Sequence, residues 1–172
     1  GIFIHYGIYS VRGIAESWYF RSSPLTRYKP YMKQIKGFTA KNYDPEYWAK
    51  LFKDAGAKYA VLTTKHHDGV ALFDTKFSDL SVVKKSPAKR DLVAPYCDAL
   101  RNNDLRVGLY FTQCDWSAKD YTAKTWHPVK YFIDTYFLNK KHWKMFKQFH
   151  RSQLTEILTN YGKIDLLWFD GD

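Results

Sequence analysis

Apolar residues form several short unbroken runs along the chain, and each run turns polar at its end. Residues 59–63 and 106–111 are the plainest examples, and residues 1–5 and 164–169 have the same character. A strand that is buried on both faces has this unbroken pattern, whereas a half-exposed strand alternates apolar and polar positions. The pattern therefore predicts four strands of a parallel sheet.

The segments between these runs have the residue spacing of helices. In residues 44–56, Asp44 is a good N-cap, Pro45 suits the first helical position and Gly56 suits the end. A second helix is expected at about residues 91–102, and a third from about residue 141 to a stop at Gly162. Helices that alternate with strands in this way indicate a parallel α/β architecture.

Two folds fit this alternation, the open doubly wound sheet and the closed barrel. No Gly-rich phosphate loop follows a strand, and all four strands carry polar or aromatic residues just past their C-terminal ends. We therefore expect a (β/α)8 TIM-type barrel. A whole barrel has eight strands and about 250 residues. Residues 1–172 are thus expected to be one partial catalytic barrel domain, about the first four strand–helix units, truncated at both ends.

Composition narrows the function classes. A hydrophobic content of 45% with 19% aromatic residues supports a packed domain and excludes disorder. The formal net charge of +10 could suggest nucleic acid, but the basic residues are spread over helix faces and loops without a nucleic-acid motif. No apolar run is long enough for a membrane span, and no targeting signal is visible. Cys97 and Cys114 lack metal-ligand spacing, and Cys97 falls among apolar helix positions.

Active sites of parallel barrels lie at the C-terminal ends of the strands. The chemistry-bearing residues at or next to these ends are His5, His66, His67, Asp68, Tyr110, Asp115, Trp116, Trp168, Asp170 and Asp172. A lone histidine such as His5 is often a core residue, and isolated tryptophans such as Trp18 and Trp168 often are too. Asp170 is more informative, because it follows a strongly apolar run, where a buried charge is costly and therefore often marks a functional site.

Metal ligation is an alternative for the adjacent histidines. His66, His67 and Asp68 are all competent ligands. Neighbouring residues on a strand point to opposite faces, however, and neither HxH nor HExxH spacing occurs. We therefore expect no metal and no organic cofactor.

Six short segments, taken together, resemble glycoside hydrolase family 29, the α-L-fucosidases. They occur in the family's order and span nearly the whole chain. They are GIFIHYG (1–7), ESWY (16–19), TKHHDG (64–69), KRD (89–91), GLY (108–110) and LWFDG (167–171). The chain differs from the family pattern at Tyr6, which replaces a tryptophan, at Ser17, which separates Glu16 from Trp18, and at Phe111, where a second tyrosine is common.

The resemblance implies a retaining exo-α-L-fucosidase that acts on terminal fucose of glycans through a covalent intermediate. Asp170 matches the nucleophile, and the acid/base residue would lie beyond residue 172. The matches for residues that bind the sugar or line its pocket are His5, Trp18, His66, His67, Tyr110 and Trp168. The family also implies an extracytoplasmic or lysosomal setting. The chain alone is expected to be inactive and poorly soluble, because an open half-barrel exposes strand edges and apolar surface.

Two other functions remain open. A carbohydrate-binding descendant of such an enzyme would keep His66, His67 and Trp18 but would hydrolyse nothing. Retention of Asp170 argues against this, because a binding protein does not need a nucleophile. A metal-dependent barrel hydrolase is the third possibility, and it would lose activity in EDTA, which should leave a fucosidase unaffected.

Overall fold

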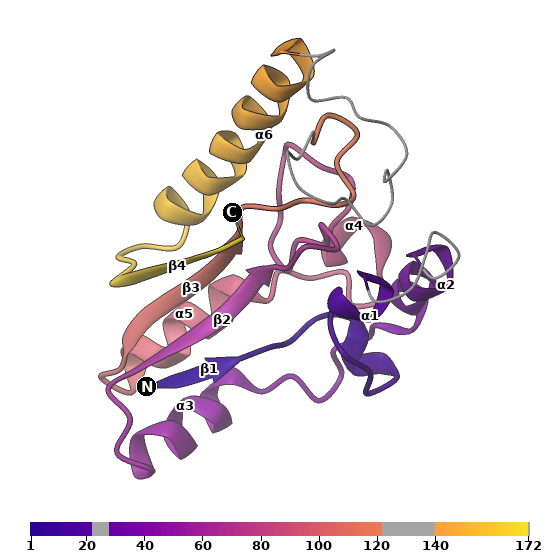
Figure 1. Ribbon diagram of the computed structural model, residues 1–172. Helices are drawn as coiled ribbons and strands as arrows, with labels where there is room; N and C mark the ends of the chain where they lie inside the picture. The colour runs from indigo at the N-terminus through magenta and orange to yellow at the C-terminus, as the bar shows by residue number, and fades with distance from the viewer. Residues whose placement is uncertain (22–27, 122–139, 172) are drawn as a thin grey trace.

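The computed structural model of the chain describes residues 1–21, 28–121 and 140–171 (Figure 1). The elements in chain order are β1 (Ile2–Ile4), η1 (Ile8–Val11), α1 (Trp18–Arg21), α2 (Tyr28–Met32), η2 (Lys33–Gly37), α3 (Pro45–Asp54), β2 (Tyr59–Lys65), α4 (Val82–Lys85), α5 (Val93–Asn102), β3 (Arg106–Thr112), α6 (Lys140–Thr159) and β4 (Leu166–Asp170). Of these, η1 and η2 are 3-10 helices.

The four strands form one parallel sheet in the order β1-β2-β3-β4 (Figure 1). The predicted parallel α/β class and the four predicted strands are confirmed. Their ends differ from the prediction by one or two residues. In particular, β4 includes Asp170, which pairs in register with Thr112 of β3.

The local signals read from the sequence act as expected in α3. The Asp44 side chain accepts a hydrogen bond from the Tyr47 amide at 3.0 Å, and Pro45 is the first helical residue. Gly56 follows the helix with φ of +78°, a conformation that glycine adopts without strain. Helix α5 begins two residues later than predicted, because Asp91 lies outside it and caps it by accepting from the Val93 and Ala94 amides.

The hydrophobic core lies between the sheet and the helices. Ala60 and Leu62 of β2 and Val107 and Leu109 of β3 are buried there, together with Cys97 of α5. Helix α5 packs on β2 and β3 and also on α3. Phe111 of β3 contacts His150 of α6, so α6 lies on the same side. We call this side of the sheet the helix side.

The other side of the sheet is also rich in large side chains. The registers place Phe3 beside Val61, and Tyr110 beside Thr63 and Trp168. Phe3 packs edge-on against Trp168 at 5.2 Å between ring centroids. Phe3 and Trp168 nevertheless stay 38% and 47% exposed. We call this the pocket side, because the polar groups at the strand ends face it.

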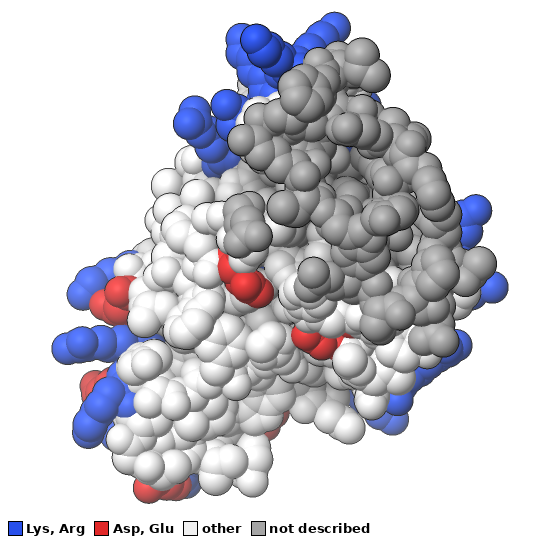
Figure 2. All heavy atoms as spheres, in the orientation of Figure 1, with Lys and Arg blue, Asp and Glu red and all other residues white. Residues whose placement is uncertain are grey.

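The charged side chains of the described residues stand at several places on the surface. In the view of Figure 2, lysines and arginines lie around the margin of the molecule, and carboxylates lie nearer its middle. This agrees with a solvated surface. Among the described residues, no helix has the length and apolar character needed to cross a membrane.

Candidate active site

The C-terminal ends of the four strands bring together residues from distant parts of the chain. His5 follows β1, His66 and His67 follow β2, Tyr110 lies near the end of β3 and Asp170 ends β4. The His66 ring lies 5.5 Å from the His5 ring and stacks on the Tyr110 ring at 5.4 Å, with the two planes 9° apart. The parallel sheet therefore assembles one cluster from four separate segments, and we call it the pocket cluster.

A β-bulge in β2 decides which side chains face the cluster. Thr63 pairs with Tyr110, but the next pairing joins Lys65 to Phe111, so Thr64 is an extra residue. The shift sends Lys65 to the helix side, where its ammonium lies 4.5 Å from the centre of the Phe111 ring. His66 then points to the pocket side. Without the extra residue, the alternation of the strand would exchange the two sides.

Both histidines contact the pocket cluster, which corrects the expectation that they point to opposite faces. Strand β2 ends at Lys65, and a turn closed by the Gly69 amide and the His66 carbonyl follows it. His66 keeps the side that β2 gives it, whereas the turn, not strand alternation, places His67 in the same cluster. Their rings lie 4.5 Å apart, and one nitrogen of each lies within 4.8 Å of an Asp170 carboxylate oxygen.

Each histidine is held through its Nδ1 atom. His66 Nδ1 is hydrogen-bonded to the Ser17 hydroxyl, and His67 Nδ1 lies 2.5 Å from the Thr112 hydroxyl. His67 Nε2 lies 3.6 Å from Asp170, and the contact of His66 uses only its Nδ1 atom. Ser17 and Thr112 were missed as site residues, because nothing in their sequence neighbourhood indicates which side chain they contact.

Asp170 is the carboxylate at the centre of the cluster. The Tyr110 hydroxyl donates to its Oδ2 atom at 2.7 Å, and the Gly171 amide donates to Oδ1 at 2.9 Å. His67 Nε2 lies 3.6 Å from Oδ2. The Asp170 side chain is nevertheless 42% exposed. It is thus fixed in orientation and still open to a ligand.

Two tryptophans lie at the edge of the cluster. Trp18 packs edge-on against His67 at 5.5 Å and against Trp116 at 5.6 Å, and it is 38% exposed. Trp168 is held by Phe3 on the pocket side of the sheet. Partly exposed aromatic rings beside carboxylates and imidazoles suit the apolar face of a sugar.

Burial sets the charge state of His66. The side chain is almost fully buried, and burial together with the neighbouring His67 and His5 lowers its pKa from 6.5 to about 2. The imidazole is therefore neutral across the physiological range. A neutral ring offers either a donor or a lone pair at Nε2, depending on which nitrogen carries the proton.

Asp68 and Asp115, both candidates at the strand ends, have structural partners instead. Asp68 is 2% exposed and accepts from the Tyr31 hydroxyl and the Val70 amide. It does not join the group of possible metal ligands that contains His66 and His67. Asp115 is buried against Lys65 at 3.0 Å on the helix side. Asp172 lies outside the described residues.

The three differences from the family pattern occupy different places. Tyr6 packs among Phe38, Tyr43 and Trp48, and Phe111 lies on the helix side. None of these packing partners of Tyr6 and Phe111 belongs to the pocket cluster. Ser17 does contact it, through His66.

Similarity to known proteins agrees with this geometry. The family model described as Alpha-L-fucosidase matches residues 1–172. Human plasma alpha-L-fucosidase is 32% identical over 188 aligned residues, which cover all of this chain and 38% of that protein. The structure of alpha-L-fucosidase isoenzyme 1 from Paenibacillus thiaminolyticus is 39% identical, with a TM-score of 0.85, and the match covers 99% of this chain and 40% of that one. A Bacteroides thetaiotaomicron fucosidase of family GH29, trapped as a covalent intermediate with 2-fluoro-fucosyl fluoride, is 29% identical with a TM-score of 0.80, and the match covers 99% of this chain and 39% of that one. The chain thus spans about two fifths of the length of these proteins.

Proposed function

The chain belongs to the α-L-fucosidase family, and we propose that it forms the first part of the catalytic domain of a retaining exo-α-L-fucosidase. The observation that carries the proposal is Asp170. This carboxylate is held by Tyr110 and Gly171, lies next to two imidazoles, and stays accessible at the end of a strand. A carboxylate with these properties is suited to attack an anomeric carbon.

We propose that the four strands are half of a (β/α)8 barrel and that residues 1–172 lie in one domain. Three features support this. The strands follow one another in sequence order, whereas a doubly wound sheet reverses its order. Helices α3, α5 and α6 all pack on the helix side of the sheet. The pocket side exposes large residues such as Phe3 and Trp168, which closure of a barrel would bury.

In the proposed reaction, an Asp170 oxygen forms a bond to the anomeric carbon as the bond to the glycosidic oxygen breaks. Positive charge develops on the sugar ring, and the ionised carboxylate stabilises it before bonding. The leaving oxygen takes a proton from the acid/base residue, which in this family would lie outside residues 1–172. Water then attacks the same carbon, gives its proton to that acid/base residue and releases Asp170, and the two displacements restore the original configuration.

The neighbours of Asp170 have separate roles in this proposal. The Tyr110 hydroxyl orients the carboxylate through its hydrogen bond of 2.7 Å. His5, His66 and His67 bind hydroxyls of the sugar, and Trp18 and Trp168 cover its apolar surface. Buried donors and acceptors that match one hydroxyl pattern reject others, because an unmatched buried polar group costs about 1 to 3 kcal/mol.

The proposed substrate is a glycan or glycoconjugate with terminal α-L-fucose. The structures of related bacterial fucosidases with fucose-like ligands support this class. No metal or organic cofactor takes part in the proposed reaction. We also propose an extracytoplasmic setting, on the ground that one relative is named as a plasma enzyme.

Hydrolysis of an aryl α-L-fucoside by the full-length protein tests the proposal. Asp170→Gly should lower kcat by about 10³-fold or more, since it removes the nucleophile. Added azide should restore turnover, because the anion fits the space left by the carboxylate. Asp79→Gly is the matched control, since Asp79 is exposed in a loop and pairs only with Lys84 among the described contacts. Unchanged turnover in Asp170→Gly would contradict the assignment, and fucose binding without any hydrolysis would favour the carbohydrate-binding alternative.

A further inference from the structure

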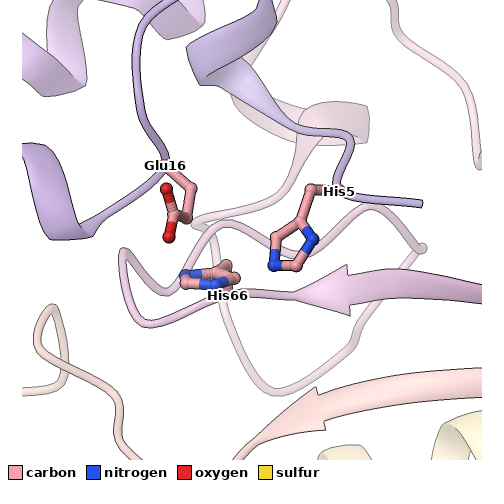
Figure 3. Close-up of side chains that lie close together, drawn as sticks. All are labelled: His5, Glu16 and His66. Carbon is pink, nitrogen blue, oxygen red and sulfur yellow. The ribbon is translucent and has the colours of Figure 1, made fainter. Parts of the chain in front are cut away.

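His5 and His66 of the pocket cluster form, together with the neighbouring Glu16, a group that could bind a cation. His5 follows β1, Glu16 precedes α1 and His66 follows β2. One ligand atom from each lies within 4.8 Å of the other two. Figure 3 shows the Glu16 carboxylate and the His5 ring both directed toward His66. Two imidazoles and one carboxylate are a ligand set that Zn²⁺ accepts.

These ligand atoms are not committed to other groups. Within residues 1–21, 28–121 and 140–171, no hydrogen bond involves the Glu16 carboxylate or the His5 ring nitrogens. His66 is bonded through Nδ1 to the buried Ser17 hydroxyl, which leaves Nε2 for a ligand. Ligating histidines usually have their second nitrogen held by such a hydrogen bond, which fixes the tautomer and the ring orientation.

A second group, His66 with His67 and Asp170, is less suited to a cation. Tyr110 and Gly171 already donate to the two Asp170 oxygens. His67 is buried and held by Thr112, so it has little freedom to adjust. His5 is exposed and Glu16 is half-buried, so these two side chains are free to move toward a metal.

We propose that His5, Glu16 and His66 bind Zn²⁺ in this protein, with water as the fourth ligand, and that bound Zn²⁺ excludes the sugar from the pocket. Tetrahedral Zn²⁺ with ligands at about 2.1 Å needs neighbouring ligand atoms about 3.4 Å apart. The group must therefore contract, and the exposed His5 and the half-buried Glu16 supply the movement while His66 stays in place. The metal is an inhibitor here and has no part in the reaction.

Calorimetric titration of the full-length protein with Zn²⁺ tests the binding directly. We expect one site in the unmodified protein and a loss of affinity of about tenfold or more in His5→Ala and in Glu16→Gln, because each loses one ligand. Ser17→Ala should lose about 10-fold, since it frees the ring that Ser17 orients. His142→Ala is the control. His142 pairs with Asp120, and neither residue belongs to the two groups of possible metal ligands, so this variant should bind Zn²⁺ with the affinity of the unmodified protein.

The choice of variants separates the two possible groups. Affinity that falls in His67→Ala and Asp170→Asn but not in His5→Ala or Glu16→Gln would overturn the proposal, and so would the absence of any saturable binding. Because His5 and Glu16 are not buried, their variants should fold, which thermal unfolding in EDTA checks.

The inhibitory half of the inference rests on the proposed function, whereas the binding half does not. Zn²⁺ should raise KM for the aryl fucoside and leave kcat unchanged, and EDTA should reverse the effect. Hydrolysis that Zn²⁺ does not affect would overturn the inference and leave the proposed function standing. Zn²⁺ binding to a protein without hydrolytic activity would contradict the proposed function and leave the Zn²⁺ site standing.

Discussion

Two polar clusters lie at the ends of the same strands, on opposite sides of the sheet, and they differ in how completely their groups are paired. The helix-side cluster consists of Lys65, Thr75, Asp115, Gln153 and Glu156. The pocket cluster consists of His5, His66, His67, Tyr110 and Asp170, and Glu16 lies beside it. The first is closed to solvent and internally bonded, whereas the second is partly open and has ligand atoms to spare.

The pairing in the helix-side cluster is continuous. Lys65 donates to Asp115 at 3.0 Å and to Gln153 at 2.8 Å. Gln153 in turn donates to Thr75, and Thr75 donates to Glu156. Although burial alone would raise the pKa of Asp115, Lys65 and the Ser117 hydroxyl and amide hold it below its usual value. The chain of bonds joins β2, the loop after β3 and α6, so its role is to hold these elements together.

The difference between the clusters teaches how to sort strand-end residues. Both clusters contain buried or half-buried charged groups, so charge near a strand end does not by itself indicate a site. A side chain whose polar atoms are all used by the protein holds structure. A side chain that the protein orients without using it fully is available to a ligand: His66 is bonded through Nδ1 alone, and Asp170 is held by two bonds but stays 42% exposed.

The largest effect is expected from breaking the ion pair of the helix-side cluster. Lys65→Met should lower the free energy of unfolding by about 3 to 5 kcal/mol, because it removes the counter-ion of the buried Asp115 carboxylate. Urea unfolding of the full-length protein measures this. Lys53→Met removes an exposed pair with Asp104 and should cost less than about 1 kcal/mol.

Two further variants sharpen that result. Lys65→Met with Asp115→Asn should be more stable than Lys65→Met alone, because the uncompensated charge is gone. Asp170→Asn, in the pocket cluster, should change the free energy of unfolding by less than about 1 kcal/mol. A cost for Asp170→Asn equal to that of Lys65→Met would erase the proposed difference between the clusters.

The next effect concerns pH. Burial raises the pKa of Asp68 from 3.8 to about 6, so the folded protein holds this proton where the unfolded chain has lost it, and stability falls as pH rises from 4 to 6. Burial lowers the pKa of His66 from 6.5 to about 2, so the unfolded chain holds the extra proton, and stability rises over the same range. The two contributions oppose each other and should nearly cancel.

Variants separate these two contributions. Asp68→Asn should uncover the His66 term, with unfolding free energy rising relative to the unmodified protein by about 1.4 kcal/mol per pH unit between pH 4 and 6. His66→Gln should give the opposite slope. Urea unfolding at several pH values measures both, and variants whose slopes match the unmodified protein would refute the assignment of these charge states.

A smaller effect is expected at the contact that orients Asp170, the proposed nucleophile. Tyr110→Phe removes the hydrogen bond to Asp170 and should lower kcat by about 10- to 100-fold, since bonds to charged groups contribute about 1.5 to 3 kcal/mol. Stability should change little, because the ring and its stacking on His66 remain. Tyr96→Phe, whose hydroxyl has a long contact of 3.4 Å to Gly108 in the core, is the control and should leave kcat unaltered. Equal rates for Tyr110→Phe and the unmodified protein would mean that Tyr110 does not orient Asp170.

The sequence predicts the main elements well because their signals are local. Strands β2 and β3 are unbroken apolar runs, and α3 has its cap, its proline and its terminal glycine within the segment itself. The short helices α1, α2 and α4 were not predicted. Each has only four or five residues, which is too few for a periodic pattern to appear.

The site is only partly readable from the sequence for a related reason. Position at the C-terminal end of a parallel strand identified His5, His66, Tyr110 and Asp170 as neighbours, and the structure brings them together. The same rule also selected Asp115, which belongs to the helix-side cluster. Which side a residue faces depends on the bulge and on the end of β2, and these are properties of strand pairing that no single segment carries.

The bulge at Thr64 makes the length of this segment as important as its composition. The number of residues in this segment decides that Lys65 faces the helix side and that His66 faces the pocket side. A substitution within the segment alters one side chain at a time. Loss of a single residue would instead turn Lys65 to the pocket side and His66 to the helix side, so a deletion here changes both sides of the sheet at once.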